Sequence, residues 1–167
     1  RATEAIALWR RALELDPLLA EAHAAMGITY ARERDWASAT RSFERALELN
    51  STLTQIQASY SSSTLIPLGQ AEKAQQLLTA ALKVDPLSVQ VRRELAVAQF
   101  VAGRYDDAIA NWRRVNAADP SISHQMLARS LTVAGRPEEA IELWEKDARE
   151  RDYSPGDGWE RWVARAY

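Results

Sequence analysis

Apolar residues along this chain recur with the spacing of amphipathic helices, and these helices come in pairs. Over residues 20–32, small and apolar side chains repeat every three or four positions, as they do on one face of a helix. Arg34 and Asp35 interrupt this pattern, and a second apolar stripe runs from Trp36 to Leu47 at the same spacing. The pattern therefore predicts two antiparallel helices joined by a short turn.

The helix pair is one unit of a longer repeat. The phrase Ala-Leu-Glu-Leu-Asp-Pro at residues 12–17 returns in altered form three more times, ending at Ser51, Pro86 and Pro120. The steps from Pro17 through these ends are 34, 35 and 34 residues. A fixed period of this length indicates stacked units, each of which buries its apolar face against its neighbours. The second unit is one residue longer, and Pro67 is expected to end or kink its first helix.

The residues of these units resemble the tetratricopeptide repeat, a family of 34-residue helix pairs. In the first full unit, the family's characteristic positions hold His23, Met26, Gly27, Tyr30, Ala39, Phe43, Ala46 and Ser51. In the third unit they hold Arg92, Leu95, Ala96, Gln99, Ala108, Trp112, Val115 and Pro120. The glycine that often breaks the helix pair in this family appears as Gly69, Gly103 and Gly135. The likeness extends over essentially the whole chain.

The resemblance implies an all-α, right-handed superhelical solenoid of antiparallel helix pairs, with about ten helices. We expect one array over residues 1–167, divided into half a repeat, four repeats and half a repeat at 1–17, 20–53, 54–88, 89–120, 121–152 and 157–167. The fourth repeat is about two residues short before Gly135. Close helix contacts are expected at the small residues Gly27, Ala39 and Ala46, and core filling at Phe43, Trp9, Trp112 and Trp144.

Composition and charge exclude several kinds of partner. A net charge of −2 predicts no general attraction to nucleic acid or to anionic lipid. No run of about 18 apolar residues is present, so we expect no membrane insertion. The chain has no cysteine, which excludes disulfides and leaves the compartment open between cytoplasm and periplasm. Because it starts inside a repeat without an initiator Met, we expect a fragment of a longer array.

No arrangement of residues indicates catalysis, so we expect no enzyme, cofactor or metal site. The phosphate-binding, dinucleotide-binding and nucleophile-elbow motifs are absent. His23 and His124 lie far apart in a linear array, where they cannot share a metal, and are expected to be structural. The acidic pairs at 106–107 and 138–139 each follow a Gly-Arg turn, where they are expected to stabilise the start of a helix.

In this family the first helix of each pair lines a concave groove. Carried over position by position, the resemblance places these residues on the peptide-groove wall: Ile28, Ser59, Ser63, Gln90, Arg93, Val97, Phe100, Gln125 and Arg129. It also places Ala24 and Ala31 there and, in the second repeat, Ile56 and Ile66, with the register of that repeat open by one residue. Arg93 and Arg129 suit a bidentate grip on a carboxylate. One subclass clamps a C-terminal carboxylate with Lys and Asn, but Ala24 and Ile28 replace the first two of these, which argues against a receptor of that type.

One stretch of the second unit is free of charge. Between Glu48 and Glu72 no residue is charged, and residues 51–64 are rich in hydroxyl side chains. Two interpretations stand side by side. The stretch is a neutral, hydrogen-bonding wall of the groove, or it belongs to a drifted repeat whose hydroxyls bond back to their own helix.

Three hypotheses for function follow. The first is a protein-interaction scaffold that binds a peptide or partner helix in its concave groove. The second is a self-assembling, homo-oligomeric module that associates through apolar terminal helices, the last of which carries Trp159 and Trp162. The third is a regulatory segment of a larger bacterial enzyme or transcription regulator, suggested by residues 150–155.

Overall fold

The computed structural model describes residues 2–122 and 124–150, which form nine α-helices, one of them extended by a π-helical segment, and no strand. The helices are α1 Ala2–Leu15, α2 Ala20–Arg32, α3 Trp36–Leu49, α4 Thr54–Tyr60 with the π-helix η1 Ser61–Leu65, α5 Ala71–Val84, α6 Val89–Val101, α7 Tyr105–Ala118, α8 Gln125–Val133 and α9 Pro137–Glu150. The expected half repeat at 157–167, with Trp159 and Trp162, lies outside the described residues.

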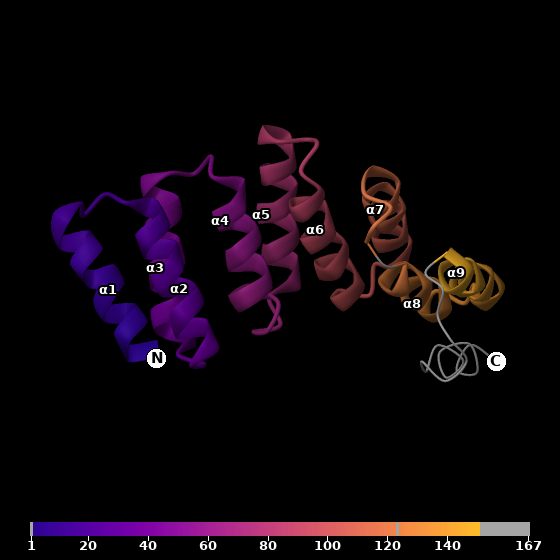
Figure 1. Cartoon of the computed structure of the whole chain (residues 1–167), viewed down its shortest axis with the longest axis horizontal. Coiled ribbons are helices and arrows are strands. Elements are labelled where there is room, and N and C mark those ends of the chain that lie inside the picture. The colour runs from indigo at the N-terminus through magenta and orange to yellow at the C-terminus, as the bar shows by residue number, and fades with distance from the viewer. Residues whose placement is uncertain (1, 123, 151–167) are drawn as a thin grey trace.

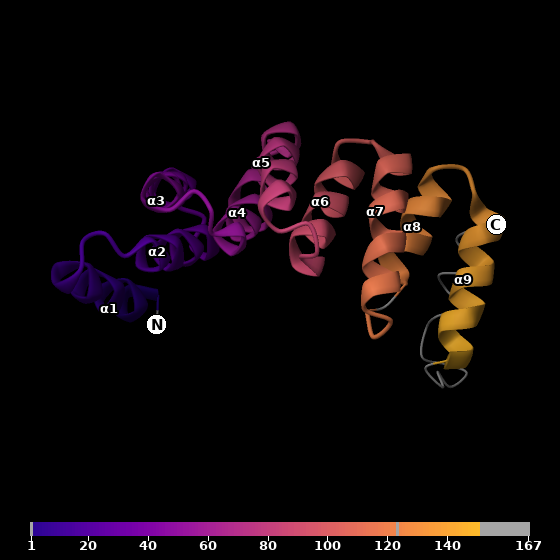
Figure 2. The ribbon, with the colours of Figure 1, turned by 90° about the horizontal axis from the view of Figure 1, so that it is seen from above.

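The helices stand in a row in chain order, with α1 and α9 at opposite ends (Figure 1). Helix α3 is seen side-on and α9 end-on in Figure 1, and the reverse holds in Figure 2, so the helix axes turn along the row. Each helix packs mainly against its neighbours in sequence. This is the expected all-α solenoid of stacked helix pairs.

The first helices of the first three full repeats pack against one another, and the second helices beside them do not. Helix α2 contacts α4, and α4 contacts α6, whereas the second helices α3 and α5 are joined at most by a weak contact between described residues. The row therefore curves around its first helices. The core forms two clusters, one from α2 to α6 and one from α6 to α9, so that α6 contributes to both.

Gly27 shows why small residues are needed where the helices of a pair approach. A Cβ atom placed on Gly27 would lie 2.7 Å from Cδ2 of Phe43. The Phe43 ring is fully buried and stacks on Tyr60 at 5.0 Å between ring centroids. Ala39 and Ala46 are also fully buried. The sequence prediction for these small positions is confirmed.

The tryptophans of the second helices divide into two groups. Trp112 and Trp144 are buried in the second core cluster, as expected. Trp9 occupies the matching position on α1, but 37% of it is exposed. The prediction that Trp9 fills the core is wrong for the described residues, because α1 packs mainly against α2 and leaves the indole partly exposed.

Each first helix ends at a residue with left-handed backbone. Gly69, Gly103 and Gly135 have φ of 73°, 75° and 77°, and Arg34 has φ of 61° at the equivalent place. The next residue donates its N–H to a carbonyl five positions back, as from Arg104 to Gln99 at 2.9 Å. This is a Schellman cap, which satisfies carbonyls at the helix end. The Gly-based breaks are as expected, and Arg34 adopts the same conformation without a glycine.

The recurring Asp-Pro phrase ends each second helix through a side-chain turn. The Oδ1 atoms of Asp16, Asn50, Asp85 and Asp119 each accept the N–H two residues onward, at 3.0, 3.1, 3.2 and 3.0 Å. Such Asx turns redirect the chain into the next helix. The hydrogen bond from Ser121 lowers the pKa of the Asp119 carboxyl below its ordinary value.

A second side-chain bond fixes the start of the first helix in three of the repeats. His23 Nε2 lies 3.3 Å from the Pro17 carbonyl, Gln57 Nε2 donates to the Ser51 carbonyl at 3.1 Å, and Arg92 Nη2 donates to the Pro86 carbonyl at 2.7 Å. Each donor is the fourth residue after its helix N-cap, at Leu19, Leu53 and Ser88 respectively. His23 therefore has the structural role that the sequence predicted.

The extra residue of the second repeat is absorbed as η1. The stretch from Leu53 to Gly69 is one residue longer than those from Leu19 to Arg34 and from Ser88 to Gly103. Within it, Ile66 N–H bonds to the Ser61 carbonyl at 2.9 Å, an i to i−5 bond. Such single π-turns inside α-helices take up one residue locally. Pro67 follows η1 within the last turn, and Gly69 ends the helix.

The serines of η1 bond back to their own helix. Ser61 Oγ donates to the Gln57 carbonyl at 2.8 Å, Ser62 Oγ to the Ala58 carbonyl at 3.0 Å, and Ser63 Oγ to the Ser59 carbonyl at 2.5 Å. Ser61 and Thr64 are fully buried. Of the two interpretations of the charge-free stretch, the one with back-bonded hydroxyls is confirmed.

The first helix of the fourth repeat is short. Helix α8 has 9 residues, against 13 in α2 and in α6, which matches the expected shortening before Gly135. Asp106 and Asp107 lie in the first turn of α7, and Glu138 and Glu139 in that of α9. Both acidic pairs thus start helices, as predicted. His124 is the N-cap of α8, and its Nδ1 lies 2.9 Å from Oδ1 of the buried Asp147 on α9.

Candidate functional site

The residues expected on the concave wall divide by exposure. Gln90, Arg93, Gln125 and Arg129 are exposed, while Ile28, Ser59, Ser63, Val97 and Phe100 are half-buried. Ile28 packs against the first core cluster, and Val97 and Phe100 pack against the second. The polar members of the set are thus accessible, and the apolar members form the base beneath them.

Two of these residues, Phe100 of α6 and Arg129 of α8, lie close together, although their helices are joined at most by a weak contact between described residues. The Arg129 guanidinium carbon lies over the Phe100 ring, 5.3 Å from its centroid. Phe100 is held in turn by Tyr105, edge-on at 5.5 Å between ring centroids. A guanidinium at this distance from a ring is attracted by the ring quadrupole. Arg129 is therefore positioned by an aromatic face, and among the described residues it forms no ion pair with a carboxylate.

Arg93, unlike Arg129, is paired with a carboxylate. Its Nη2 lies 3.1 Å from Oε1 of the neighbouring Glu94, whose side chain is mostly buried. The positive charge of Arg93 is thus partly neutralised within α6. Of the two arginines that the sequence singled out for gripping a carboxylate, Arg129 is the more available one.

The π-turn settles the register of α4. Gln57 and Arg92 make the same bond four residues after their N-caps, so residues of α4 before η1 align with α6 by their distance from the N-cap. Gln55 and Ala58 therefore match Gln90 and Arg93 of α6. Ser59 lies one position beyond that match. Ile56, which the sequence placed on the wall, is buried instead. Residues near the end of this segment align with α6 by their distance from the left-handed glycine, Gly69 or Gly103. By this alignment, Ser63 and Ile66 match Val97 and Phe100.

Two small residues were also placed on the wall incorrectly. Ala24 and Ala31 of α2 are both buried. Their methyl groups lie beneath the surface because neighbouring first helices pack closely on this side. Among the residues expected on the concave wall, the exposed ones therefore all belong to α6 and α8.

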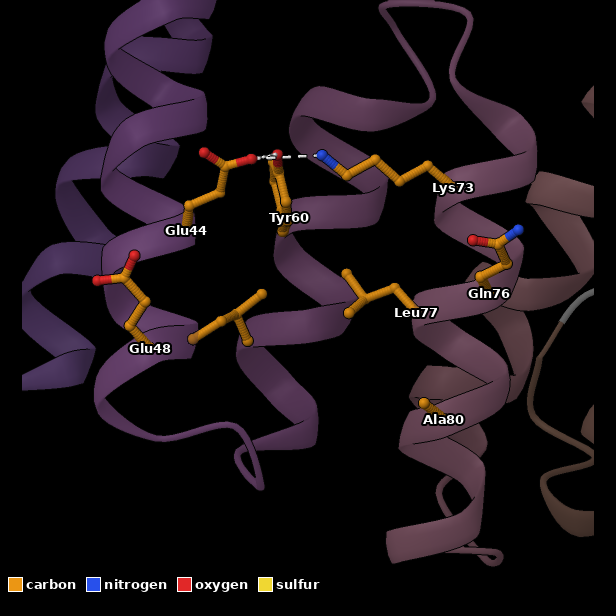
Figure 3. A pocket seen from close by; sticks show the side chains of 8 residues that line it. Glu44, Glu48, Tyr60, Lys73, Gln76, Leu77 and Ala80 are labelled. Atoms are coloured by element: carbon orange, nitrogen blue, oxygen red, sulfur yellow. Dashed lines mark hydrogen bonds and ion pairs between the residues drawn. The ribbon is translucent and has the colours of Figure 1, made fainter.

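A separate hollow, which the sequence did not suggest, opens on the outer side between the second helices. It has a volume of about 670 Å³ and lies where α3 and α5 are held apart. Figure 3 shows its two walls and Tyr60 of α4 between them. Its lining residues are Glu44, Leu47, Glu48, Tyr60, Lys73, Gln76, Leu77 and Ala80, and together we call them the outer groove.

A polar bridge closes one end of the outer groove. Lys73 Nζ lies 3.3 Å from Glu44 Oε1, and the Tyr60 hydroxyl donates to the same oxygen at 3.5 Å (Figure 3). The Lys73 ammonium also lies 5.6 Å from the centroid of the Tyr60 ring. Tyr60 stands at the helix position that holds Met26, Leu95 and Leu127 in the other repeats. That substitution was the available sequence signal for this cluster.

Burial shapes the protonation of the bridge. Burial raises the pKa of the Tyr60 hydroxyl above its ordinary value, and Lys73 offsets only part of that effect. Burial by itself would lower the pKa of Lys73, but its interactions with Tyr60 and Glu44 outweigh this, so the pKa of Lys73 also lies above its ordinary value. Both groups therefore keep their protons at neutral pH, and the bridge joins a carboxylate to a protonated amine.

A smaller hollow lies at the equivalent place of the last two repeats, between α7 and α9. The acidic and basic residues of its ion pair have exchanged helices relative to Glu44 and Lys73. The hollow has a volume of about 220 Å³ and is lined by residues of α7, α8 and α9, among them Leu127, Leu131 and Leu143. Arg113 Nη2 lies 2.9 Å from Glu139 Oε2, so the base stands on the earlier helix and the acid on the later one. Arg136 also binds Glu139, and its hydrogen bond holds the pKa of that carboxyl below the ordinary value.

The described part of the chain holds neither a cluster of metal-binding side chains nor a helix that could cross a membrane. No three His, Asp or Glu side chains gather there as a metal site would need. None of the helices described has the length and apolar run that crossing a membrane requires.

A sequence relative and several solved structures are similar to this chain. The chain is 32% identical over 120 residues, 71% of its length, to the cytochrome c-type biogenesis protein CycH of Pseudomonas aeruginosa, and it spans 30% of that protein. Among solved structures, MamA from Desulfovibrio magneticus matches with a TM-score of 0.80 at 20% identity, covering 92% of this chain and 88% of MamA. YrrB, a TPR protein with an unusual peptide-binding site, matches with a TM-score of 0.75 at 21% identity, covering 98% and 84%.

Family models agree with the repeat that the structure displays. One model described as a tetratricopeptide repeat matches residues 65–121 and 102–157, and another of the same description matches residues 20–53. These matches extend over more than half of the chain and coincide with its helix pairs, their capped breaks and their small contact positions. The protein belongs to the tetratricopeptide repeat family.

Proposed function

We propose that this array is a protein-interaction scaffold and binds a peptide or partner helix on its concave face. The observation that carries the proposal is the pair formed by Arg129 and Phe100 across two neighbouring first helices. It presents an exposed guanidinium on an aromatic base, next to the half-buried Val97. Such a surface suits a ligand with an apolar side chain and a carboxylate.

The rigidity of the wall favours this function. Helices α6 and α8 are each fixed by a capped end and by a buried side that packs into the second core cluster. A preformed wall lowers the ordering cost of binding, because few of its side chains must be immobilised when the ligand arrives. YrrB, which shares the fold, is described as having a peptide-binding site, which is consistent with this proposal.

A pair of matched peptides tests the carboxylate preference. Two fluorescein-labelled peptides that share one sequence up to the last residue would be titrated by fluorescence anisotropy. One ends in Leu-Glu with a free C-terminal carboxylate, and the other ends in Leu-Gln with a C-terminal amide. We expect the acidic peptide to bind more tightly. Arg129→Glu should weaken its binding about tenfold or more, since hydrogen bonds to charged groups contribute about 1.5–3 kcal/mol. Arg93→Glu should have a smaller effect, because Arg93 is already paired with Glu94.

The control for this test lies on the other side of the array. Arg114 on α7 is exposed and is not among the residues expected on the concave wall, so Arg114→Glu changes the net charge equally. Its effect should be much smaller than that of Arg129→Glu. If both variants weaken binding alike, the effect is one of overall charge, and the proposed role of Arg129 is wrong.

A second candidate is self-association through α1. Leu8 and Leu15 are 72% and 78% exposed on this helix, one face of which is therefore apolar and open. Exposed apolar faces of this kind favour association. Light scattering over a concentration series would show a rising mass, and replacing both leucines by Glu should abolish the rise. A mass that stays that of a monomer at every concentration rules this candidate out.

The similarity to CycH supports a biological setting. We infer that the array is the binding part of a longer protein concerned with c-type cytochrome biogenesis, since the relative matched at 32% identity carries that description. Deletion of the segment in its source organism should then reduce the amount of covalently bound haem seen by haem staining of gels. Unchanged staining would separate this chain from that process while leaving peptide binding untouched.

A further inference from the structure

The outer groove has the character of a docking surface on the side opposite the proposed peptide wall. It opens between α3 and α5, whereas the peptide wall is formed by first helices. The bridge from Glu44 to Lys73 closes one end (Figure 3). Beyond the bridge, Glu48 lies on the α3 wall and Leu77 and Ala80 lie on the α5 wall (Figure 3), and Leu47 of α3 also lines the groove. The open part of the groove is thus an apolar slot with one acidic side.

The charge of that slot is set by Glu48. Glu44 and Lys73 neutralise each other in the bridge, and no other residue lining the groove is charged. Glu48 is bonded through Oε2 to Arg45 of its own helix at 3.0 Å, and both side chains are largely exposed. Exposed pairs of this kind contribute little and are readily exchanged. The Glu48 carboxylate is therefore partly neutralised by Arg45, and a partner's cation binds it by exchanging with Arg45.

We propose that the outer groove docks an amphipathic helical segment of a partner protein that carries one bulky aliphatic residue and, one turn away, a lysine or arginine. The aliphatic side chain enters the slot between Leu47 and Leu77, and the cation meets Glu48. Helix-in-groove recognition uses anchors spaced by one helical turn in this way. The acidic wall disfavours segments with a carboxylate at the same place, because like charges in contact repel.

A tethering experiment can read this preference directly, because the natural chain has no cysteine. Ala80 is exposed at the edge of the slot, so Ala80→Cys introduces a single thiol there. The probes are two helical peptides with a disulfide-capped thiol and one leucine, followed four residues later by arginine in one and by glutamate in the other. At a fixed concentration of reductant, the fraction of protein captured by each peptide would be measured by mass spectrometry.

We expect Ala80→Cys to capture the arginine peptide about two- to fivefold more than the glutamate peptide, the range that an exposed ion pair supplies. Adding Glu48→Gln should remove the preference, and adding Leu77→Ser should lower the capture of both peptides. Thr79→Cys is the matched control, since Thr79 is exposed on the same helix but does not line the groove, and it should show no preference.

Equal capture of the two peptides by Ala80→Cys, or a preference that survives Glu48→Gln, overturns the proposal. Circular dichroism of each variant confirms that the helices are intact, so that a loss of capture is not a loss of fold. A second copy of the chain is the other occupant to be tested. If sedimentation shows a dimer that Glu48→Gln and Leu77→Ser disrupt, the groove is a self-association surface, and the proposed partner segment is wrong.

Discussion

Helix α6 and the segment formed by α4 and η1 are the same element of two neighbouring repeats, yet one is regular and the other is not. Both begin with a side chain that binds a carbonyl six residues back, Arg92 in α6 and Gln57 in α4. Both end at a left-handed glycine, Gly103 and Gly69. The segment with η1 carries one more residue between these fixed ends.

The difference shows where a solenoid can absorb an insertion. The two ends of a first helix determine how the next helix is placed, and both ends are held by the same bonds in both repeats. The extra residue is therefore taken up in the middle, as a π-turn. Three serines of this segment bond to carbonyls four residues back, a pattern that often bends helices. The array keeps its stacking, and only the face that the helix presents is shifted.

The largest expected effect comes from removing the extra residue. Deleting Ser62, which is exposed, should make the segment as long as α6. Pro67 would then stand in the last turn of a regular α-helix, where its ring clashes with the carbonyl four residues back, at a cost of about 3 kcal/mol. We expect the deletion to lower the free energy of unfolding by about that amount, as measured by urea denaturation followed by circular dichroism.

A compensating variant tests whether the clash of Pro67 causes this loss of stability. Val101 is the residue of α6 that corresponds to Pro67, since each lies two positions before its glycine. Combining the deletion with Pro67→Val should restore stability to that of the natural chain or above it. A deletion that is harmless by itself would mean that the π-turn does not serve to accommodate Pro67.

A smaller effect is expected at one buried position where the repeats differ in the space left for a side chain. The eighth residue after the N-cap is Gly27 in α2, Ser61 in η1 and Ala96 in α6, and each is buried. Only at Gly27 does Phe43 occupy the place of a Cβ atom. Gly27→Leu should therefore cost about 2 kcal/mol through overpacking.

The matched control adds the same side chain at an open position. Ala37 is exposed near the start of α3, so Ala37→Leu should change the unfolding free energy by less than about 0.5 kcal/mol. If thermal denaturation gives both variants the same midpoint, the close approach of Gly27 to Phe43 does not limit the size of that residue.

The comparison also marks what could be foreseen from sequence. The period, the glycine breaks and the small contact residues follow from local chemistry, and all were predictable from residue types at fixed spacing. The π-turn was visible as a length of 35 instead of 34 residues, but length alone does not say where in the helix an extra residue is placed. For that reason Ile56 was placed on the wall, while the bond from Gln57 to Ser51 shows the true register.

The outer groove could not be foreseen, because it depends on a distance between helices. Its shape follows from the closer packing of first helices, which separates α3 from α5. The pairing of Glu44 with Lys73 joins residues 29 positions apart. Nothing in the spacing of a single helix indicates such a pair. The residues expected on the concave wall, by contrast, come from the family pattern, although the pairing of Arg93 with Glu94 was not anticipated.

A gain in stability is expected where the first repeat departs from the later ones. Arg34 takes the left-handed conformation that Gly69, Gly103 and Gly135 take in their repeats. A residue with a Cβ atom pays about 1–2 kcal/mol there, and glycine offsets part of this gain through its greater freedom in the unfolded chain. Arg34→Gly should therefore raise the unfolding free energy by about 0.5–1 kcal/mol in urea denaturation. A fall would show that the Arg34 side chain makes a contact that matters more than its backbone strain.

The smallest effect concerns Tyr60, the last α-helical residue before η1, where α6 has Leu95. The pKa values of Tyr60 and Lys73 are both raised in the folded chain, so their contribution is complete below the unfolded values near pH 10 and is lost as the pH rises through the folded values. Tyr60→Phe keeps the ring on Phe43 and removes a long hydrogen bond, so it should cost about 0.5 kcal/mol at pH 7. Between pH 9 and 11 the natural chain should lose stability faster than Tyr60→Phe, as followed by urea denaturation at each pH. Parallel curves for the two proteins would assign the alkaline loss to the other tyrosines and lysines, and the bridge would then contribute no pH dependence.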